Sequence, residues 1–232
     1  MRYSRTVSGI FLERPNRFIA YCEIDGVREK CHVKNTGRCR ELLIPGVKVV
    51  LYVSDNPSRS TKYDLIAVWK GKRLVNIDSQ APNAVVKESF SKICPYDKLI
   101  PEYTFGESRF DFYAERDGKR IFAEVKGVTK ELDDVVCFPD APTERGLKHV
   151  RELTRLASEG EECYVVFVVQ MGDVEYFVPD YPIHVEFGKA LEEASRAGVK
   201  ILAIDCEVTE DSMTLRNPVE VRLGTEYFPK IW

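Results

Sequence analysis

The sequence predicts a two-domain chain of the α/β class, α+β overall, in which a small β-barrel precedes helices packed on a mixed sheet. Residues 1–80 contain five short apolar runs separated by turn residues, a pattern typical of a small barrel or sandwich. Residues 81–232 alternate helical periodicity with a charged hairpin and two apolar runs, which indicates an α/β layer. Charge divides at the same place. Residues 1–80 hold 15 Lys and Arg against 8 Asp and Glu, and the remainder holds 19 against 29. A basic first domain is suited to a polyanionic partner.

Several classes of protein are disfavoured by composition. No apolar run approaches the roughly 18 residues of a membrane helix, and the N-terminus lacks the apolar core of a signal peptide, so we expect a cytoplasmic protein with no membrane partner. The seven cysteines are odd in number and form no C-x-x-C pair, which argues against zinc-ribbon and thioredoxin-like sites. We predict that most of them are buried free thiols.

The first domain is predicted to be an OB-like barrel. Its strands are expected at residues 7–12, 18–24, 27–33, 47–53 and 63–70, and five strands in fewer than 80 residues suit this fold, a frequent platform for single-stranded nucleic acid. Phosphate grooves with stacking rings need cations and aromatics near loops. The candidates of this kind are Arg38, Arg40, Arg59, Lys62 and Tyr63. Local charge bias also occurs on ordinary solvated faces, and most aromatics belong to cores, so that alternative stays open.

A hairpin over Ser108–Thr129 organises the second domain. Asp117-Gly118 favours a two-residue type I′ turn, because both central residues of that turn need positive φ. Arg116 then faces Lys119, Asp111 falls opposite Glu124, and Arg109 falls opposite Lys126. Strand alternation predicts one apolar face and one polar face. The apolar face is expected to hold Phe110, Phe112, Ala114, Ile121, Ala123 and Val125, and the polar face Arg109, Asp111, Tyr113, Glu115, Arg120, Phe122, Glu124 and Lys126.

Two opposed carboxylates are the unusual feature of this hairpin. Opposed residues have Cβ atoms about 4.5–5.5 Å apart, and like charges there are destabilising. A divalent cation between Asp111 and Glu124 would remove that cost, because hard cations prefer oxygen ligands. Lys126 projects from the same face. The alternative is a solvated strand face, since a D/E-x-K triplet is common in a chain with 31% charged residues.

Three helices and two buried strands complete the second domain. Helical periodicity covers Ala84–Ile93, which contains Glu88, and Val185–Ala197. Asp140-Ala141-Pro142 predicts the start of a helix over Thr143–Ser158. On that helix, Arg145, Lys148 and His149 are expected opposite the apolar stripe, where they either receive a phosphodiester or form an ordinary solvated face. The predicted buried strands are Cys163–Gln170 and Val199–Ile204.

Five stretches of the sequence are distinctive: His32–Arg38, Val75–Asn83, Gly106–Phe112, Glu124–Thr129 and Phe138–His149. Taken together in this order and spacing, they resemble the sugar fermentation stimulation protein A family over nearly the whole chain. Asp111 and Glu124-Val125-Lys126 on adjacent strands also resemble the PD-(D/E)XK nuclease-like core, although no proline precedes Asp111. The resemblance implies an OB-like domain over 1–80, a nuclease-like domain over 81–232, DNA binding without marked sequence preference, and a regulatory role in sugar metabolism.

The leading hypothesis is a metal-dependent nucleic-acid phosphodiesterase. Asp111, Glu124 and the Val125 carbonyl would hold Mg²⁺ or Mn²⁺, and Lys126 would orient water or stabilise charge on the phosphate. Glu88 or Glu102 would be an outer carboxylate. The backbone of DNA, with RNA as an alternative, would be contacted in this domain by Arg109, Arg145, Lys148 and His149. The rival hypotheses are a non-catalytic DNA-binding regulator that keeps the nuclease fold, and a protein-binding role for the acidic domain.

Overall fold

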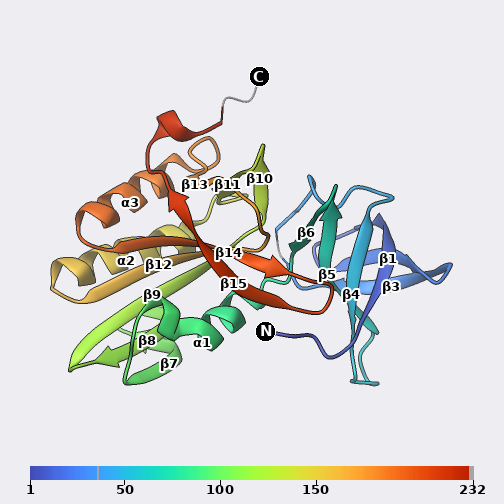
Figure 1. Ribbon diagram of the computed structural model, residues 1–232, viewed down its shortest axis with the longest axis horizontal. Helices are drawn as coiled ribbons and strands as arrows, with labels where there is room; N and C mark the ends of the chain where they lie inside the picture. Colours follow the sequence, from blue (N-terminus) through green and yellow to red (C-terminus); the bar gives the residue numbers. More distant parts are fainter. Residues whose placement is uncertain (36, 230–232) are drawn as a thin grey trace.

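The computed structural model describes residues 1–35 and 37–229. Two units lie side by side, with a β-barrel on the right of Figure 1 and a larger sheet with helices on the left. Thr36, part of a loop predicted at 35–38, lies outside the described residues. No helix in the described part of the chain is long and apolar enough to cross a membrane. All seven cysteines are buried and free, as predicted.

The first unit is a closed five-stranded barrel. Its strands are β1 (Thr6–Glu13), β2 (Ile19–Ile24), β3 (Val27–Val33), β4 (Lys48–Val53) and β5 (Tyr63–Lys70). They follow the order β3-β2-β1-β4-β5, and a parallel pairing of β3 with β5 closes the ring. This arrangement confirms the OB-like prediction. A sixth strand that the sequence did not predict, β6 (Arg73–Asn76), pairs antiparallel with β5 and lies between the barrel and the second unit (Figure 1).

The second unit is a nine-stranded mixed sheet, in the order β10-β11-β13-β15-β14-β12-β9-β8-β7. Its helices are α1 (Ala81–Ile93), α2 (Glu144–Ser158) and α3 (Val185–Arg196), followed by a short 3₁₀ turn, η1 (Thr225–Tyr227). The strands are β7 (Lys98–Phe105), β8 (Ser108–Arg116), β9 (Lys119–Val128), β10 (Lys130–Leu132), β11 (Val135–Phe138), β12 (Glu162–Val169), β13 (Tyr176–Pro179), β14 (Lys200–Val208) and β15 (Met213–Val221). The predicted mixed sheet is therefore confirmed, although β10, β11, β13 and β15 were not foreseen.

Helices cover both faces of this sheet. Phe90 of α1 packs against Phe112, with ring centroids 5.5 Å apart, while α2 and α3 pack over the opposite face. Tyr113, Phe122 and Glu124 are consequently buried. The alternative of a solvated strand face is therefore wrong at these positions, because His149 of α2 packs against this face at Glu124.

The hairpin turn and its register are as the sequence predicted over most of their length. Asp117 and Gly118 have φ values of 51° and 75°, which a type I′ turn requires. The ladder pairs Arg116 with Lys119 and continues to Phe112 with Ala123. It stops there, so Asp111 and Glu124 are not a ladder pair, and neither are Arg109 and Lys126.

The predicted apolar face is also wrong at Phe110. Its ring packs on Phe122 and on His149 of α2, at centroid distances of 5.4 and 6.2 Å, whereas Phe112 lies on the α1 side. The reason is an irregularity beside Asp111. The neighbouring β7 places Glu102 at a φ of 53°, and the β7–β8 ladder skips that pair. Phe110 and Phe112 therefore lie on opposite faces of the sheet.

Helix α2 begins later than predicted. Its N-cap is Thr143, whose hydroxyl accepts the Gly146 N–H at 3.1 Å, so the cap is not the acid at Asp140. Leu147 and Val150 are buried as expected, but so is His149. The placement of His149 on the solvent face is therefore wrong, and its ring faces the sheet instead.

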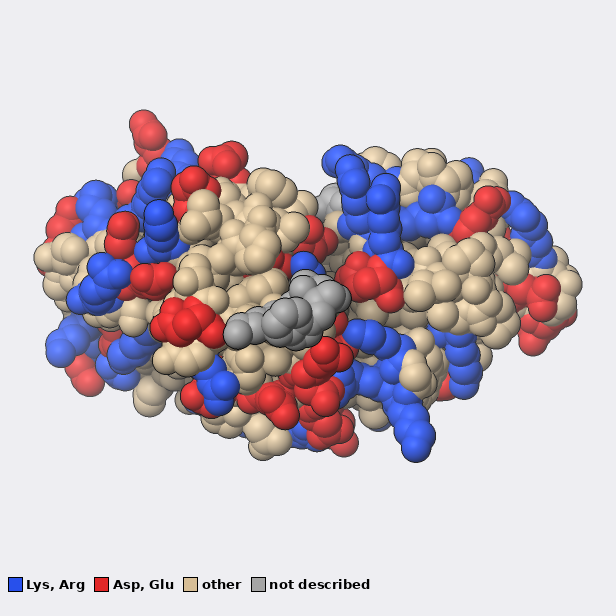
Figure 2. All heavy atoms as spheres, turned by 90° about the horizontal axis from the view of Figure 1, so that it is seen from above, with Lys and Arg blue, Asp and Glu red and all other residues tan. Residues whose placement is uncertain are grey.

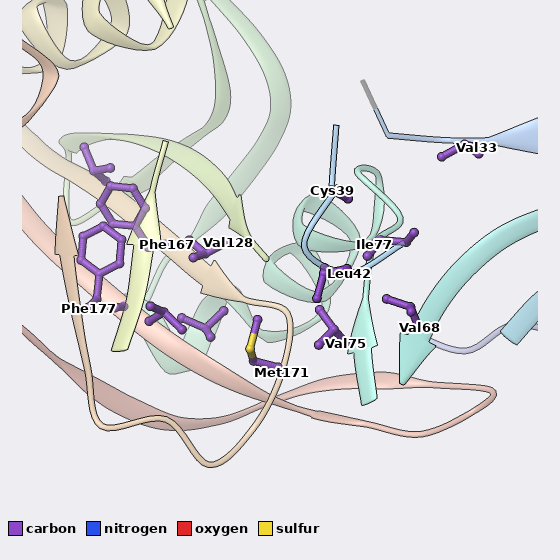
Figure 3. Packing of buried hydrophobic residues seen from close by; sticks show 14 of the residues in the cluster. Val33, Cys39, Leu42, Val68, Val75, Ile77, Val128, Phe167, Met171 and Phe177 are labelled. Carbon is purple, nitrogen blue, oxygen red and sulfur yellow. The ribbon is translucent and has the colours of Figure 1, made fainter. Parts of the chain in front are cut away.

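The two units share one hydrophobic core. A single cluster joins barrel residues such as Leu42 and Ile77 to Val128 and Met171 of the second unit, and these side chains line the junction in Figure 3. Gln170 adds polar contacts at the same place. Its Nε2 donates to Asn76 Oδ1 at 3.0 Å and to the Asp78 carbonyl at 3.1 Å.

Candidate metal and nucleic-acid site

Asp111 lies where the β8–β9 ladder ends. Its Oδ2 accepts the backbone N–H of Val125 at 2.8 Å, which takes the place of the missing ladder bond. Its Oδ1 accepts from the Asn83 amide of α1 at 2.8 Å. One carboxylate thus joins two strands and a helix. Asp111 is brought next to Glu124 by this side-chain contact, not by a direct cross-strand pair.

Glu124 is the more deeply buried of the two carboxylates. It is 2% exposed. Its Oε1 accepts from Lys126 Nζ at 2.5 Å and also bonds to Nδ1 of His149. Its Oε2 is buried and has no hydrogen-bond partner. A buried carboxylate oxygen without a partner is costly, because it has lost water and gained nothing in exchange.

The backbone of Val125 completes the arrangement. A residue in a strand directs its N–H and its carbonyl to the same side. The Val125 N–H points to Asp111, so the Val125 carbonyl also faces β8, beyond the end of the ladder. The Val125 carbonyl is therefore on the same side as Asp111, whose carboxyl is close enough to Glu124 for the charge of Glu124 to act on it, and Lys126 bonds to Glu124.

The two carboxyl groups differ in their electrostatics. Burial, together with the charge of Glu124, raises the pKa of Asp111 above its usual value. Burial would also raise the pKa of Glu124, but the His149 hydrogen bond and the nearby Lys126 outweigh it and lower that pKa. Glu124 is therefore the carboxylate that stays ionised most readily. Such opposed shifts in neighbouring carboxyls are typical of functional sites.

The donor set suits a hard divalent cation. Carboxylate and carbonyl oxygens are the ligands that Mg²⁺, Mn²⁺ and Ca²⁺ prefer, and the free Oε2 of Glu124 gives a cation one position to fill. No group of three or more His, Cys, Asp or Glu side chains within 1–35 and 37–229 is placed to hold a metal ion. A cation here would keep several waters, which is usual for Mg²⁺.

The two candidates for an outer carboxylate lie differently. Glu88 forms an ion pair with the amino group of Met1 at 2.7 Å, with its side chain 57% exposed. Glu102 is exposed, and its carboxylate is 3.9 Å from Arg109. Glu102 lies on β7 at the level of Asp111, in the pair that the β7–β8 ladder skips.

The predicted phosphate contacts of the second domain separate into two groups. Arg145 is exposed at the start of α2, and Lys148 is also exposed, 3.9 Å from Glu107. Arg109 is exposed beside Glu102. His149 instead belongs with Glu124. The sequence predicted a phosphate contact for His149, whereas its observed partner is the Glu124 carboxylate.

The predicted barrel contacts also separate. Arg38 and Arg40 are exposed and line one groove. Arg59 is occupied elsewhere, because its guanidinium donates to the fully buried Asp64 at 2.5 and 3.1 Å. Tyr63 is buried in the barrel core, and Lys62 Nζ lies 5.1 Å from the centroid of its ring. Figure 2 shows basic side chains gathered on the barrel half, at right, next to the junction.

Sequence reasoning did not find Asn83 or Gln170 as residues of this region. Asn83 fixes Asp111, and Gln170 lies against Gly127, next to Lys126. Asn83 immediately precedes the helix predicted over Ala84–Ile93, Gln170 ends the strand predicted over Cys163–Gln170, and no periodicity marks either of them. Only the fold brings them to the hairpin.

Comparison with known proteins agrees with this architecture. A family model described as the SfsA N-terminal OB domain matches residues 12–77. A second, described as the sugar fermentation stimulation protein RE domain, matches residues 80–212. The chain belongs to the sugar fermentation stimulation protein (SfsA) family.

Relatives of the SfsA family match over nearly their whole length. A sugar fermentation stimulation protein homolog of Desulfitobacterium hafniense is 56% identical over 225 residues, covering 96% of this chain and 99% of the relative. A homolog of Ruminiclostridium cellulolyticum is 52% identical over 226 residues, covering 96% and 100%. The solved structure of Pyrococcus furiosus SfsA in complex with Ca²⁺ superposes with a TM-score of 0.85 at 28% identity, covering 96% of this chain and 98% of that one.

Proposed function

We propose that this SfsA-family protein binds DNA through its backbone and hydrolyses phosphodiester bonds with a divalent cation held by Asp111, Glu124 and the Val125 carbonyl. The observation that carries the metal site is the buried Oε2 of Glu124, which lacks a partner while the other oxygen of the same carboxylate has two. The structure of Pyrococcus furiosus SfsA was determined in complex with Ca²⁺, and that cation favours the same oxygen ligands.

The residues of the site have distinct proposed roles. A bound Mg²⁺ or Mn²⁺ supplies Lewis-acid charge that polarises a phosphoryl oxygen and acidifies water. Lys126 places an ammonium next to Glu124, where it stabilises negative charge that develops on the phosphate. Asn83 holds Asp111 in place. Arg109, Arg145 and Lys148 are exposed, and they position the backbone of the nucleic acid.

DNA binding is proposed from the charge and the fold together. Basic side chains gather on the OB-like barrel next to the second domain, and this fold commonly binds nucleic acid. Because phosphate neutralisation would dominate, we expect binding without marked sequence preference that weakens steeply with salt. RNA has the same phosphates, so the salt titration should measure binding of both DNA and RNA.

The decisive experiment compares Asp111→Asn with the wild type on end-labelled DNA in Mn²⁺. We expect cleavage to be lost and binding to be kept, because Asn preserves the shape of the side chain but removes the anionic ligand. Glu115→Gln removes a carboxylate from the same strand, away from the site, and serves as the matched control. Equal cleavage by Asp111→Asn and the wild type would sink the site assignment.

A second candidate function is a non-catalytic DNA-binding regulator of sugar metabolism. One observation favours it. Lys126 and His149 together already bind Oε1 of Glu124, which is what a nuclease core kept only for its structure would show. If the wild type cuts no DNA or RNA in either Mg²⁺ or Mn²⁺ while still binding them, this second function replaces the first.

A further inference from the structure

A groove on the barrel carries four arginines. It lies between the β1–β2 loop and the β3–β4 connection and has a volume of about 430 Å³. Arg14, Arg17, Arg38 and Arg40 line it together with Glu13, and its apolar lining is Phe11, Leu43 and Pro45. We call this feature the arginine groove. It is separate from the Asp111–Glu124 site, which lies in the other domain, and only Arg38 and Arg40 were predicted from the sequence.

Arg14 is the fixed part of the arginine groove. Its Nη1 donates to the carbonyls of Gly37 and Arg38 at 2.8 and 2.9 Å. Its Nη2 donates to those of Arg17 and Asn35 at 2.7 and 2.6 Å. Four of the five guanidinium N–H groups thus tie two loops together, while the fifth, on Nε, is buried without a partner. The charge of Arg14 meets only neutral carbonyls.

The other three arginines are exposed and available. Arg17, Arg38 and Arg40 have no ion pair with any carboxylate in the described ranges 1–35 and 37–229. Arg59, outside the groove, pairs with Asp64. Glu13 also lines the groove, but it pairs with Arg28, outside it. Four arginines against one glutamate leave the groove with a net positive charge, and a bound anion lowers the repulsion among them.

The floor of the groove is apolar and consists of Phe11, Leu43 and Pro45. Pro45 is exposed, whereas Phe11 and Leu43 are 2% and 8% exposed and belong mainly to the barrel core. A concave site with an apolar floor and a cationic rim fits a ligand that has a flat apolar face and an attached phosphate. An unstacked nucleotide has both. A duplex keeps its bases stacked inside and offers only phosphates, so it cannot use the floor.

We propose that the arginine groove binds single-stranded nucleic acid, with backbone phosphates on Arg17, Arg38 and Arg40 and an unstacked base against Pro45 and the edge of Leu43. Arg14 holds the two loops that carry these arginines at a fixed separation. This inference rests on the proposed function, because it names the form of nucleic acid that the protein takes. It does not depend on a bound metal or on cleavage.

The test measures binding of a labelled oligothymidylate of about 16 nucleotides, the upper site size for one OB fold, over a salt series. The variant Arg38→Ala/Arg40→Ala is compared with Lys30→Ala/Lys72→Ala, which removes the same charge from exposed barrel positions outside the groove. We expect the arginine variant to lose at least about tenfold in affinity and its salt slope to fall by about 1.4, since each single-strand phosphate contact contributes about 0.7. The lysine variant should keep the slope of the wild type.

Two further ligands test the base-binding floor and the strand form. An abasic strand of equal length should bind more weakly than the oligothymidylate, and a blunt duplex should lose little affinity in the arginine variant. Equal binding of the abasic strand would show that phosphates alone occupy the groove and would overturn the proposal.

The outcomes also separate this inference from the proposed function. If the wild type binds nucleic acid but the arginine and lysine variants behave alike, the groove proposal fails and the proposed function stands. If the wild type prefers duplex at every salt concentration, the single-strand proposal fails in the same way. If the wild type binds neither form, both fail together.

Discussion

Replacing His149 by alanine should weaken metal binding without unfolding the protein. Oε1 of Glu124 has two donors, Lys126 and His149, and the second comes from α2. Removing His149 frees the carboxylate to turn toward Lys126, so Oε2 no longer faces the position of the cation. Loss of a hydrogen bond that orients a metal ligand typically costs about 10–100-fold in metal affinity, which is about 1.4–2.8 kcal/mol.

Calorimetric titration with Mn²⁺ measures this effect directly, with thermal unfolding as the check on folding. His184→Ala is the matched control, because His184 is 7% exposed against 5% for His149 and its Nδ1 accepts the Thr143 N–H at the start of α2. His149→Gln should recover part of the affinity, since its amide N–H can replace the lost donor. If His149→Ala binds Mn²⁺ within about twofold of the wild type, well short of the range for such partners, then His149 does not position Glu124.

Three further substitutions test other parts of the fold. Burial would raise the pKa of Asp64, but the Arg59 hydrogen bond and the charge of a nearby lysine outweigh it and lower that pKa. Asp64 therefore stabilises the fold above its unfolded pKa of about 3.9, and this contribution is lost as pH falls through the folded value. Asp64→Asn should lower the free energy of unfolding by about 3 kcal/mol at pH 7. The difference in unfolding free energy between this variant and the wild type should shrink below about pH 4, and a difference that stays constant with pH would refute the reasoning. Gly127→Ala should lower the free energy of unfolding in urea by about 1–3 kcal/mol, because a Cβ there meets Pro82 Cγ at 2.8 Å and also Gln170. An unchanged urea midpoint would mean that Pro82 and Gln170 move to make room for the methyl group. Gly118→Ala meets no neighbour within 4 Å but has φ of 75°, so a loss of about 1–2 kcal/mol should come from the backbone alone.

The sequence was sufficient where the governing physics is local. The hairpin register followed from the turn chemistry of Asp117-Gly118 and from the side-chain period of a strand. The end of the ladder at Asp111 was not predictable, because its cause lies in the next strand, where Glu102 has a positive φ. Phe110 changes face for the same reason, and no pattern within the hairpin records that event.

The candidate site shows the same limit. Periodicity located helix α2 and its apolar stripe, but a buried histidine is polar in the sequence, so His149 was assigned to the wrong side of the helix. The buried position of His149 is explained by its hydrogen bond to Glu124 on the facing strand. Arg59 was misread for a similar reason, because its partner Asp64 is a buried acid inside an otherwise apolar strand. Arg14 and Arg17 were missed because they lie in the connection between the strands predicted at 7–12 and 18–24.

Gln170 has a consequence for communication between the two domains. Its backbone N–H donates to Val128 of β9, and its carbonyl accepts from Asn76 of β6, both at 2.9 Å. The strand that carries Glu124 and Lys126 is therefore tied to the barrel through one residue. A nucleic-acid strand bound to the barrel, as proposed, and the proposed cation at Asp111 and Glu124 would then be connected through Gln170. If the cation changes the affinity for nucleic acid by some factor, nucleic acid must change the affinity for the cation by the same factor, because coupling between two binding sites is reciprocal.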